Sequence, residues 1–158
     1  MRRHFFIIPG VNLEAPELRI TNTAVLHQAR QVLRLSVGEE VAIGDGVGKV
    51  MPGEIARIEP KALLVRGKAT EAVKNPGRFT MIYIAILKRD NLEWVAEKAT
   101  EAGVREIVPL LTARSIKLKF VRSRLEKIVQ EAAEQAGQVL LPKILEPTAL
   151  RGALREAK

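Results

Sequence analysis

The sequence predicts a mixed α/β protein made of two parts that differ in their pattern of apolar residues. Before Asn75-Pro76-Gly77, short apolar runs alternate with turn residues around a single helical segment, which is typical of a small β-barrel. After this point strands and helices alternate, which is typical of an α/β sheet with right-handed crossovers. We therefore expect α/β architecture in the second part and an α+β protein overall.

The first part is predicted to contain four strands and one helix. The strands are expected at residues 4–8, 40–43, 47–58 and 62–67. Asp45-Gly46 favours a hairpin turn, and Pro52-Gly53 predicts a bulge or bend. The helix is expected at residues 21–33, with Thr21, Asn22 or Thr23 as its N-cap. Its buried face is expected to consist of Val25, Leu26, Ala29, Val32 and Leu33.

The second part is predicted to begin with an apolar strand at residues 79–87, covered on both faces as in a parallel sheet. A helix follows at residues 91–102, and Gly103 is its expected C-terminal stop. Its apolar stripe consists of Leu92, Val95, Ala96 and Ala99. Trp94 on the same helix is expected to belong to the core rather than to a binding surface.

A second buried strand is expected at residues 106–111, and a long helix at residues 123–136. Ser123 is its predicted N-cap and Gly137 its end. A third strand is expected at residues 143–145, and Pro147-Thr148 opens a last helix. The inward face of the long helix is expected to be Leu125, Ile128, Val129, Ala132, Ala133 and Ala136.

The composition excludes several classes of protein. The 158 residues contain no cysteine, which excludes disulfides and cysteine-based metal sites. No apolar run approaches the roughly 20 residues of a membrane span, and the N-terminal run is too short for a secretory signal. We expect a soluble, cytoplasmic protein without a membrane partner.

The net charge of +8 favours a polyanion as partner. Residues 1–76 contain 11 Lys and Arg against 8 Asp and Glu, and residues 77–158 contain 15 against 10. Two groups of cations suit contacts with an RNA backbone, although a solvated surface loop is the alternative for the second. They are Arg2, Arg3, Arg30 and Arg34 in the first part, and Arg114, Lys117, Lys119, Arg122, Arg124 and Lys127 in the second. Because Phe, Tyr and Trp total only six, stacking of many successive bases is not expected.

Classical catalytic motifs are absent from the sequence. It has two histidines, no glycine-rich phosphate loop and no carboxylate cluster, so no metal site is predicted. His27 is expected to be a partly buried structural residue. Polar residues at the carboxyl ends of predicted parallel strands, where α/β proteins bind ligands, are the better candidates. They are Lys88 and Arg114-Ser115, joined by Glu101, Glu131, Glu134 and Gln135 on the helices, for which solvent-facing positions are the alternative.

These residues carry a resemblance to a known family. The matching segments are residues 87–89, Trp94, residues 97–104, 107–109, 112–115 and 131–135 with Pro142, and, upstream, His27 with residues 32–34 and 44–46. Together they resemble the bacterial small-subunit (16S) ribosomal RNA uracil N3-methyltransferases of the SPOUT superfamily. The resemblance runs from the first strand to Lys158.

The resemblance implies a PUA-like RNA-binding barrel at residues 1–74 and part of a SPOUT α/β-knot domain at residues 75–158. It implies S-adenosylmethionine as cofactor, 16S rRNA of the small ribosomal subunit as partner, and a homodimer. Attack by N3 of uracil on the methyl group needs the N3 proton removed or the resulting anion stabilised, so a nearby general base or cation would serve. Arg114 and Lys88 are the candidates for the stabilising charge and Glu131 or Glu134 for proton handling. Glu101, Ser115, Glu134 and Gln135 would support the cleft, and the expected RNA contacts are Arg2, Arg3, Arg30, Arg34, Lys117, Lys119, Arg122 and Arg124.

The sequence departs from the family pattern in two places. Gln138 stands where the family usually has an arginine, which removes one expected basic contact. The Gly-Pro-Glu-Gly-Gly loop and the later Leu-Arg-x-Glu-Thr-Ala segment do not occur, so no cofactor-binding residue is named. We therefore expect the barrel and the first part of the catalytic domain, without its C-terminal knot. The alternatives are an RNA-binding module without catalysis and a structural fragment that dimerises through its open sheet edge.

Overall fold

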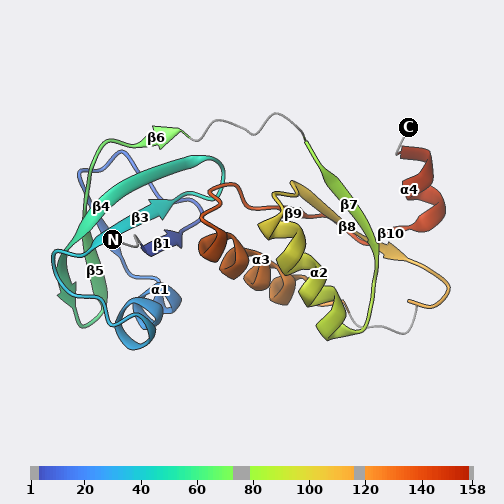
Figure 1. The fold of residues 1–158 in the computed structure, drawn as a ribbon, viewed down its shortest axis with the longest axis horizontal. Coiled ribbons are helices and arrows are strands. Elements are labelled where there is room, and N and C mark those ends of the chain that lie inside the picture. The colour runs from blue at the N-terminus through green and yellow to red at the C-terminus, as the bar shows by residue number, and fades with distance from the viewer. Residues whose placement is uncertain (1–3, 73–78, 116–119, 157–158) are drawn as a thin grey trace. The chain divides into compact units, whose positions relative to one another are not determined.

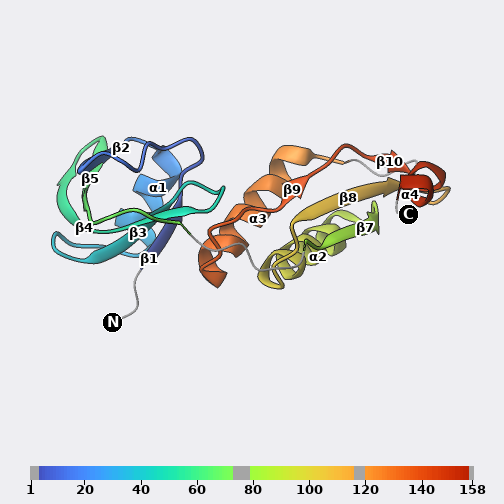
Figure 2. The same cartoon turned by 90° about the horizontal axis from the view of Figure 1, so that it is seen from above.

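The computed structural model describes residues 4–72, 79–115 and 120–156. The chain divides into two compact units, Met1–Asn75 (unit 1) and Pro76–Lys158 (unit 2). Each has its own sheet and its own buried core (Figures 1 and 2). We describe each unit by itself.

Unit 1 contains a six-stranded sheet with the strand order β1-β3-β4-β5-β2, and β6 pairs with β4. β1 lies parallel to β3, and the other pairs are antiparallel. The strands predicted near residues 4, 40, 47 and 62 are confirmed, whereas β2 and β6 were not predicted. Closure of the sheet into a barrel stays a prediction. The bounds are β1 His4–Ile7, β2 Glu17–Ile20, β3 Glu40–Gly44, β4 Lys49–Glu59, β5 Ala62–Gly67 and β6 Glu71–Ala72.

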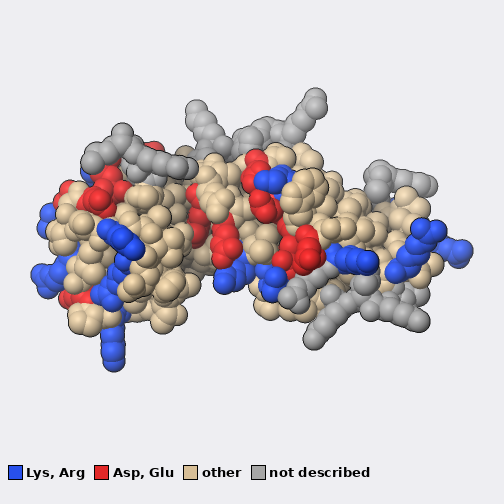
Figure 3. Space-filling model, turned by 60° about the horizontal axis from the view of Figure 1, so that its bottom comes forward, with Lys and Arg blue, Asp and Glu red and all other residues tan. Residues whose placement is uncertain are grey.

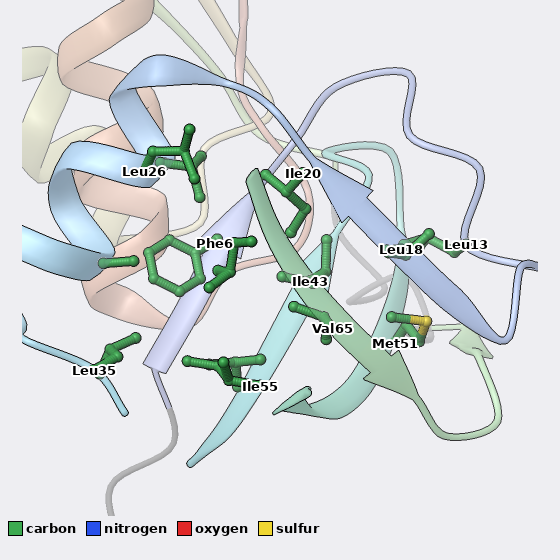
Figure 4. Close-up of a cluster of buried hydrophobic side chains, with 14 residues drawn as sticks. Phe6, Leu13, Leu18, Ile20, Leu26, Leu35, Ile43, Met51, Ile55 and Val65 are labelled. Carbon is green, nitrogen blue, oxygen red and sulfur yellow. The ribbon is translucent and has the colours of Figure 1, made fainter. Parts of the chain in front are cut away.

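The core of unit 1 draws side chains from one face of this sheet and from the helical segment that covers it (Figure 4). Phe6 of β1, Ile43 of β3 and Val65 of β5 are fully buried and meet Leu26 of α1 in the same cluster. Alternate residues of each strand point to the same face, which explains why apolar residues recur at every second position. This burial fixes the register of the sheet.

The helical segment of unit 1 is α1 (Thr23–His27) followed by a π-helical turn, η1 (Gln28–Val32). Asn22 is the N-cap, since its side-chain oxygen accepts hydrogen bonds from the N–H groups of Ala24 and Val25. Val25, Leu26 and Ala29 are buried as predicted, but Val32 is 64% exposed. The π turn winds with more residues than an α turn, so the predicted helical periodicity fails at this position.

The β3–β4 hairpin is confirmed, with the Asp45 side chain accepting hydrogen bonds from the N–H groups of Val47, Gly48 and Lys49. The predicted bulge at Pro52-Gly53 is wrong, because both residues pair in register with β3. The bulge lies at Ala56, between Ile55 and Arg57. Gly53 instead permits close packing: a Cβ atom there would lie 2.6 Å from the carbonyl oxygen of Arg66.

Unit 2 contains a parallel sheet in which β8 (Glu106–Leu111) lies between β7 (Met81–Ala85) on one side and β9 (Lys143–Ile144) and β10 (Thr148–Ala149) on the other. The predicted strands at 79–87, 106–111 and 143–145 are confirmed at their centres, and β10 was not predicted. Ile107 faces a core shared with α2 (Arg89–Glu101) and α3 (Arg122–Ala136). Val108 and Leu110 face the opposite side, where Ala153 of α4 (Leu150–Glu156) covers them.

Both predicted C-terminal glycines of unit 2 end their helices, whereas the helix starts differ from the prediction, α2 beginning at Arg89 instead of residue 91. Gly103 has a φ of 79°, and the N–H groups of Gly103 and Val104 donate to the carbonyl oxygens of Thr100 and Ala99, which closes α2. Gly137, with a φ of 69°, ends α3. α3 starts at Arg122, one residue before the predicted cap, and its N-cap residue Val121 offers no side-chain hydrogen bond.

Two other expectations for unit 2 are wrong. The residues of β7 are only half-buried, because this strand lies at the edge of the sheet and not in its middle. Trp94 is 61% exposed on the outer side of α2 rather than in the core. Leu92, Ala96 and Ala99 fill the inner side of that helix and leave Trp94 toward solvent. Among the described residues, no helix has the length and apolar character needed to cross a bilayer.

Candidate functional site

The carboxyl edge of the unit 2 sheet brings together the first group of predicted site residues. Lys88 lies between the end of β7 and the start of α2, and Arg114-Ser115 follow β8. Because β7 and β8 are parallel, both chain segments leave the sheet at the same edge (Figure 1). The side chains of Lys88 and Arg114 are exposed there.

The segment after β8 is held by two hydrogen bonds between Thr112 and Ser115. The Ser115 N–H donates to the Thr112 carbonyl oxygen at 3.0 Å, and the two side-chain hydroxyl oxygens lie 2.8 Å apart. Ser115 is buried, with 2% of its surface exposed. It therefore acts on the shape of this turn, while Arg114 projects from it into solvent. The contribution of Thr112 was missed by the sequence reasoning, although its place three residues before a predicted site serine is typical of such turns.

The first turns of α2 and α3 lie next to each other and are joined by an ion pair. Arg124 donates to both carboxylate oxygens of Glu93, with Nη2 at 2.9 Å from Oε2. The hydrogen bond to Glu93 raises the pKa of Arg124. Arg122 donates to the carbonyl oxygen of Ile144 and lies 2.6 Å from Glu146. These two predicted RNA contacts thus already have partners within unit 2. Glu93 was not predicted as a site residue.

The predicted acidic and amide residues lie toward the other end of the helices. Glu101 ends α2, whose 13 residues span about 20 Å from the carboxyl edge. Gln138, just beyond α3, donates to the Glu101 carbonyl oxygen, which places the C-terminal ends of both helices together. Glu131, Glu134 and Gln135 lie in the last two turns of α3. The structure therefore separates these residues from Lys88 and Arg114.

Local contacts of these residues are those of a helix surface. Glu131 is 3.7 Å from Lys127, and the Lys98 ammonium lies 2.9 Å from Glu101 and 2.8 Å from Glu97. Hydrogen bonds to Glu97 and Glu101 raise the pKa of Lys98. Glu134 accepts a hydrogen bond from Gln130 at 3.2 Å. The assignments of Glu131 and Glu134 to proton transfer and of Glu101 and Gln135 to the cleft stay predictions.

Of the cations predicted in unit 1, the structure describes two. Arg34 is exposed and has a φ of 54°, a backbone conformation rare for residues other than glycine. Arg30 donates to the carbonyl oxygen of Pro60 at 2.9 Å. His27, expected to be partly buried, is exposed. Arg2, Arg3, Lys117 and Lys119 lie outside the described residues.

The predicted site residues at the carboxyl edge do not by themselves suit a cationic cofactor. A sulfonium methyl donor is a cation, yet the two site residues that the carboxyl edge exposes, Lys88 and Arg114, are cations as well. Glu93 at this edge is paired with Arg124, and the other predicted acids lie at the far helix ends. We therefore assign no cofactor-binding residue and derive no step through a cofactor. No group of three or more His, Cys, Asp or Glu among the described residues could hold a metal ion.

Comparison with known families matches both units. Residues 74–158 match the RNA methyltransferase domain, and residues 20–66 match the RNA methyltransferase PUA domain. The ribosomal RNA small subunit methyltransferase E of Bacillus subtilis (strain 168) is 30% identical over 157 residues, which cover 92% of this chain and 60% of that protein. The protein of the same name from Synechocystis is 33% identical over 79% of this chain and 42% of its own length. The chain thus spans about half the length of these relatives.

Solved structures show the same fold. A putative methyltransferase of Legionella pneumophila, in complex with bound S-adenosylmethionine, superposes with a TM-score of 0.82 at 26% sequence identity. The matched region covers 100% of this chain and 68% of the Legionella chain. A ribosomal RNA small subunit methyltransferase E from Neisseria gonorrhoeae has a TM-score of 0.81 at 22% identity, over 97% and 65% of the two chains. The RNA methyltransferase domain matches more than half of the residues of this chain, and the PUA domain matches the part before it. The chain therefore belongs to the RNA methyltransferase family.

Proposed function

We propose that the protein acts in the S-adenosylmethionine-dependent methylation of N3 of a uridine in small-subunit ribosomal RNA. The observation that carries this proposal is the order of two matched domains, a PUA domain followed by an RNA methyltransferase domain. The names of the relatives support rRNA of the small subunit as substrate, and the bound cofactor of the Legionella protein supports the methyl donor. The choice of N3 of uracil rests on the motif resemblance described above.

The carboxyl edge of unit 2 suits the reacting base. Methylation of N3 requires loss of the N3 proton, and the negative charge on the uracil ring is stabilised by nearby cations. Lys88 and Arg114 supply two, and the N-terminal ends of α2 and α3 add partial positive charge at the same edge. Glu131 lies toward the other end of α3, and its role in proton transfer stays a prediction.

Unit 1 is proposed to bind the RNA as a PUA-like barrel. Arg34 supports this role, because strained backbone conformations such as its positive φ cluster at functional sites. Lys and Arg side chains lie at the surface of both units (Figure 3), as an RNA partner of both requires. Arg2, Arg3, Lys117 and Lys119 are retained as proposed contacts.

The cofactor is proposed to need the part of the relatives that this chain does not span, including the SPOUT knot. The match covers 60% of the Bacillus protein, and the predicted site residues exposed at the carboxyl edge of unit 2, Lys88 and Arg114, are cations like the methyl donor. The homodimer and the cytoplasmic location are proposed on the same family grounds.

The proposal is tested by transfer of a radiolabelled methyl group from S-adenosylmethionine to small-subunit rRNA, with digestion to nucleosides to locate the methyl group. Where transfer occurs, we expect N3-methyluridine, and we expect Arg114→Gln and Lys88→Gln each to lower the rate about 100-fold, as loss of a charge-stabilising donor does. Arg151→Gln, which removes an exposed cation from α4, is the matched control and is expected to leave the rate unchanged. A methyl group on another nucleoside, or equal rates for all three variants, would contradict the proposal.

An RNA-binding role without catalysis is the second candidate. The separation of the acidic residues from Lys88 and Arg114 favours it for this chain. Calorimetric titration with S-adenosylmethionine distinguishes the two: binding of the cofactor supports the enzyme, and RNA binding without cofactor binding supports the module.

A further inference from the structure

Several cationic side chains lie close together at the turn between β4 and β5, and their proximity is not evident from the sequence. We name as the turn cluster Arg19, Arg30, Arg57 and Lys61 together with the carboxylate of Glu59. Arg19 lies 2.6 Å and Arg57 3.7 Å from Glu59, so two guanidinium groups share one carboxylate. Among the described residues, no carboxylate pairs with Arg30 or Lys61. The cluster therefore carries an excess of positive charge.

A β-bulge places Arg57 in this cluster. Met51 and Ile55 point into the core at alternate positions of β4, so an undisturbed strand would direct Arg57 inward as well. The extra residue Ala56 shifts the register against β5. Arg57 then lies on the outer face, across Leu64 of β5 from Arg19 of β2. Bulges that redirect a side chain are over-represented next to functional sites.

Arg30 adds a cation from the helical segment. It lies in the π turn η1 and donates from Nη1 to the Pro60 carbonyl oxygen, directly before Lys61. Its buried Nε has no hydrogen-bond partner among the described residues. Because no carboxylate among the described residues neutralises this guanidinium, the electrostatic potential at the turn is positive. A nearby anion would therefore be attracted to it.

A pocket of about 320 Å³ adjoins the cluster and shares Arg19 with it. Its size is at the lower end of the range of small-ligand sites. One wall is the segment after β1, with Ile8 and Val11, and the other is β2 with Ile20. Thr21 and Asn22 add a hydroxyl and an amide at its border. Because the Asn22 oxygen caps α1, its amide nitrogen is the group that can face a ligand.

We propose that the turn cluster binds the phosphates of single-stranded RNA and that the adjoining pocket receives an unpaired base. Apolar walls suit the faces of a planar base, the hydroxyl and amide suit its edge, and the cations suit the phosphates on either side. This inference rests on RNA binding by unit 1 and specifies the surface that performs it.

The test uses the full chain and a fluorescently labelled single-stranded RNA of small-subunit sequence, with a duplex of equal length for comparison. Binding is followed by anisotropy over a series of salt concentrations. The double variant Arg57→Gln/Lys61→Gln is expected to weaken binding about tenfold and to reduce the slope of log K against log salt by about 1.4, or about 0.7 for each lost phosphate contact. The control is Lys49→Gln/Lys68→Gln, which removes two exposed cations of unit 1 that are paired with Glu14 and Glu40. It is expected to change neither value.

Thr21→Gln tests the pocket, since Thr21 is exposed and lies outside the α1 cap. The longer side chain is expected to lower affinity for the single strand about fivefold and to leave affinity for the duplex unchanged, as loss of one base contact would. If the unaltered chain binds no RNA, the proposed function of unit 1 fails and this inference with it. If it binds RNA but the cluster variant equals the control, or Thr21→Gln keeps the preference for the single strand, the inference alone is overturned.

Discussion

Unit 1 and unit 2 bury their apolar residues in different ways. In unit 1, fourteen buried hydrophobic residues form one cluster on one side of the sheet. In unit 2, nine lie between the sheet and the pair α2–α3, but only three lie on the α4 side. Among the described residues, more large hydrophobic side chains are exposed in unit 2 than in unit 1. They are Val32, Val37 and Val47 in unit 1, and Phe79, Trp94, Leu111, Val121, Leu150 and Leu154 in unit 2.

The difference follows from the type of sheet. A mainly antiparallel sheet that places most of its core on one face needs one main layer of cover, which α1 and the connecting segments of unit 1 supply. A parallel sheet is apolar on both faces and needs cover on each. Since Ala153 is the one buried residue in the described part of α4, we expect the second face of unit 2 to contribute little to its stability.

The prediction with the largest effect compares the truncation of one aromatic side chain in each unit, and it tests the difference in burial between the two units. Phe6→Ala removes a fully buried side chain and is expected to lower the free energy of unfolding of unit 1 by about 3–5 kcal/mol. Tyr83→Ala removes a half-buried side chain on the α4 face and is expected to cost unit 2 only about 1–2 kcal/mol. Urea unfolding, followed by amide hydrogen exchange to separate the two units, measures both. Equal losses would refute the unequal burial of the two faces.

A second prediction concerns the close approach of strands in unit 1. Gly53→Ala would place a Cβ atom 2.6 Å from a backbone oxygen of β5, and backbone cannot move aside as a side chain does. We expect a loss of about 1–3 kcal/mol from overpacking. Gly152→Ala in α4 is the control, since its Cβ would lie 3.5 Å from Thr148 Cγ2, an ordinary contact distance. Equal melting temperatures for the two variants would contradict this account.

The prediction with the smallest effect compares the starts of α1 and α3, for which the sequence predicts a polar side chain as N-cap in both cases. Asn22→Ala removes an acceptor of two backbone hydrogen bonds and is expected to cost about 1 kcal/mol. Ser123→Ala is expected to change the stability by less than about 0.5 kcal/mol, because Ser123 lies inside α3 and caps nothing. Chemical denaturation of both variants checks the pair, and a cost at Ser123 similar to that at Asn22 would mean that α3 begins at the residue the sequence indicates.

Elements whose structure depends on their own residues are predicted well from the sequence. Elements whose structure depends on pairing or packing with distant segments are predicted poorly. Asp45, Gly103 and Gly137 were correctly placed because their turn or helix end depends on their own side chain or backbone freedom. β2 and β10 were missed because pairing with β5 and β8, and not their short sequences, makes them strands. Trp94 was misplaced because its helix buries smaller residues on the inner side.

The candidate site shows the same limit. Lys88 and Arg114 were brought to one edge as expected, since parallel strands fix where their following residues lie. Their separation from Glu131 and Glu134 follows from the same topology, because a helix that joins two parallel strands starts at the carboxyl edge and ends at the opposite edge, although the candidate roles were assigned without regard to it. The turn cluster was missed because its cations come from β2, η1, β4 and the β4–β5 turn, and only the sheet register and the bulge at Ala56 bring them together.

The single extra residue at Ala56 also determines which deletions β4 can accept. Deletion of Ala56 would remove the bulge and leave both faces of the strand unchanged, because Ile55 and Arg57 already pair with the consecutive residues Val65 and Leu64 of β5. Ile58 would still face the core, and Arg57 and Glu59 would still lie on the outer face. Removal of both Ala56 and Arg57 would instead turn Ile58 outward and Glu59 into the core. Unit 1 should therefore tolerate the loss of this one residue better than the loss of two.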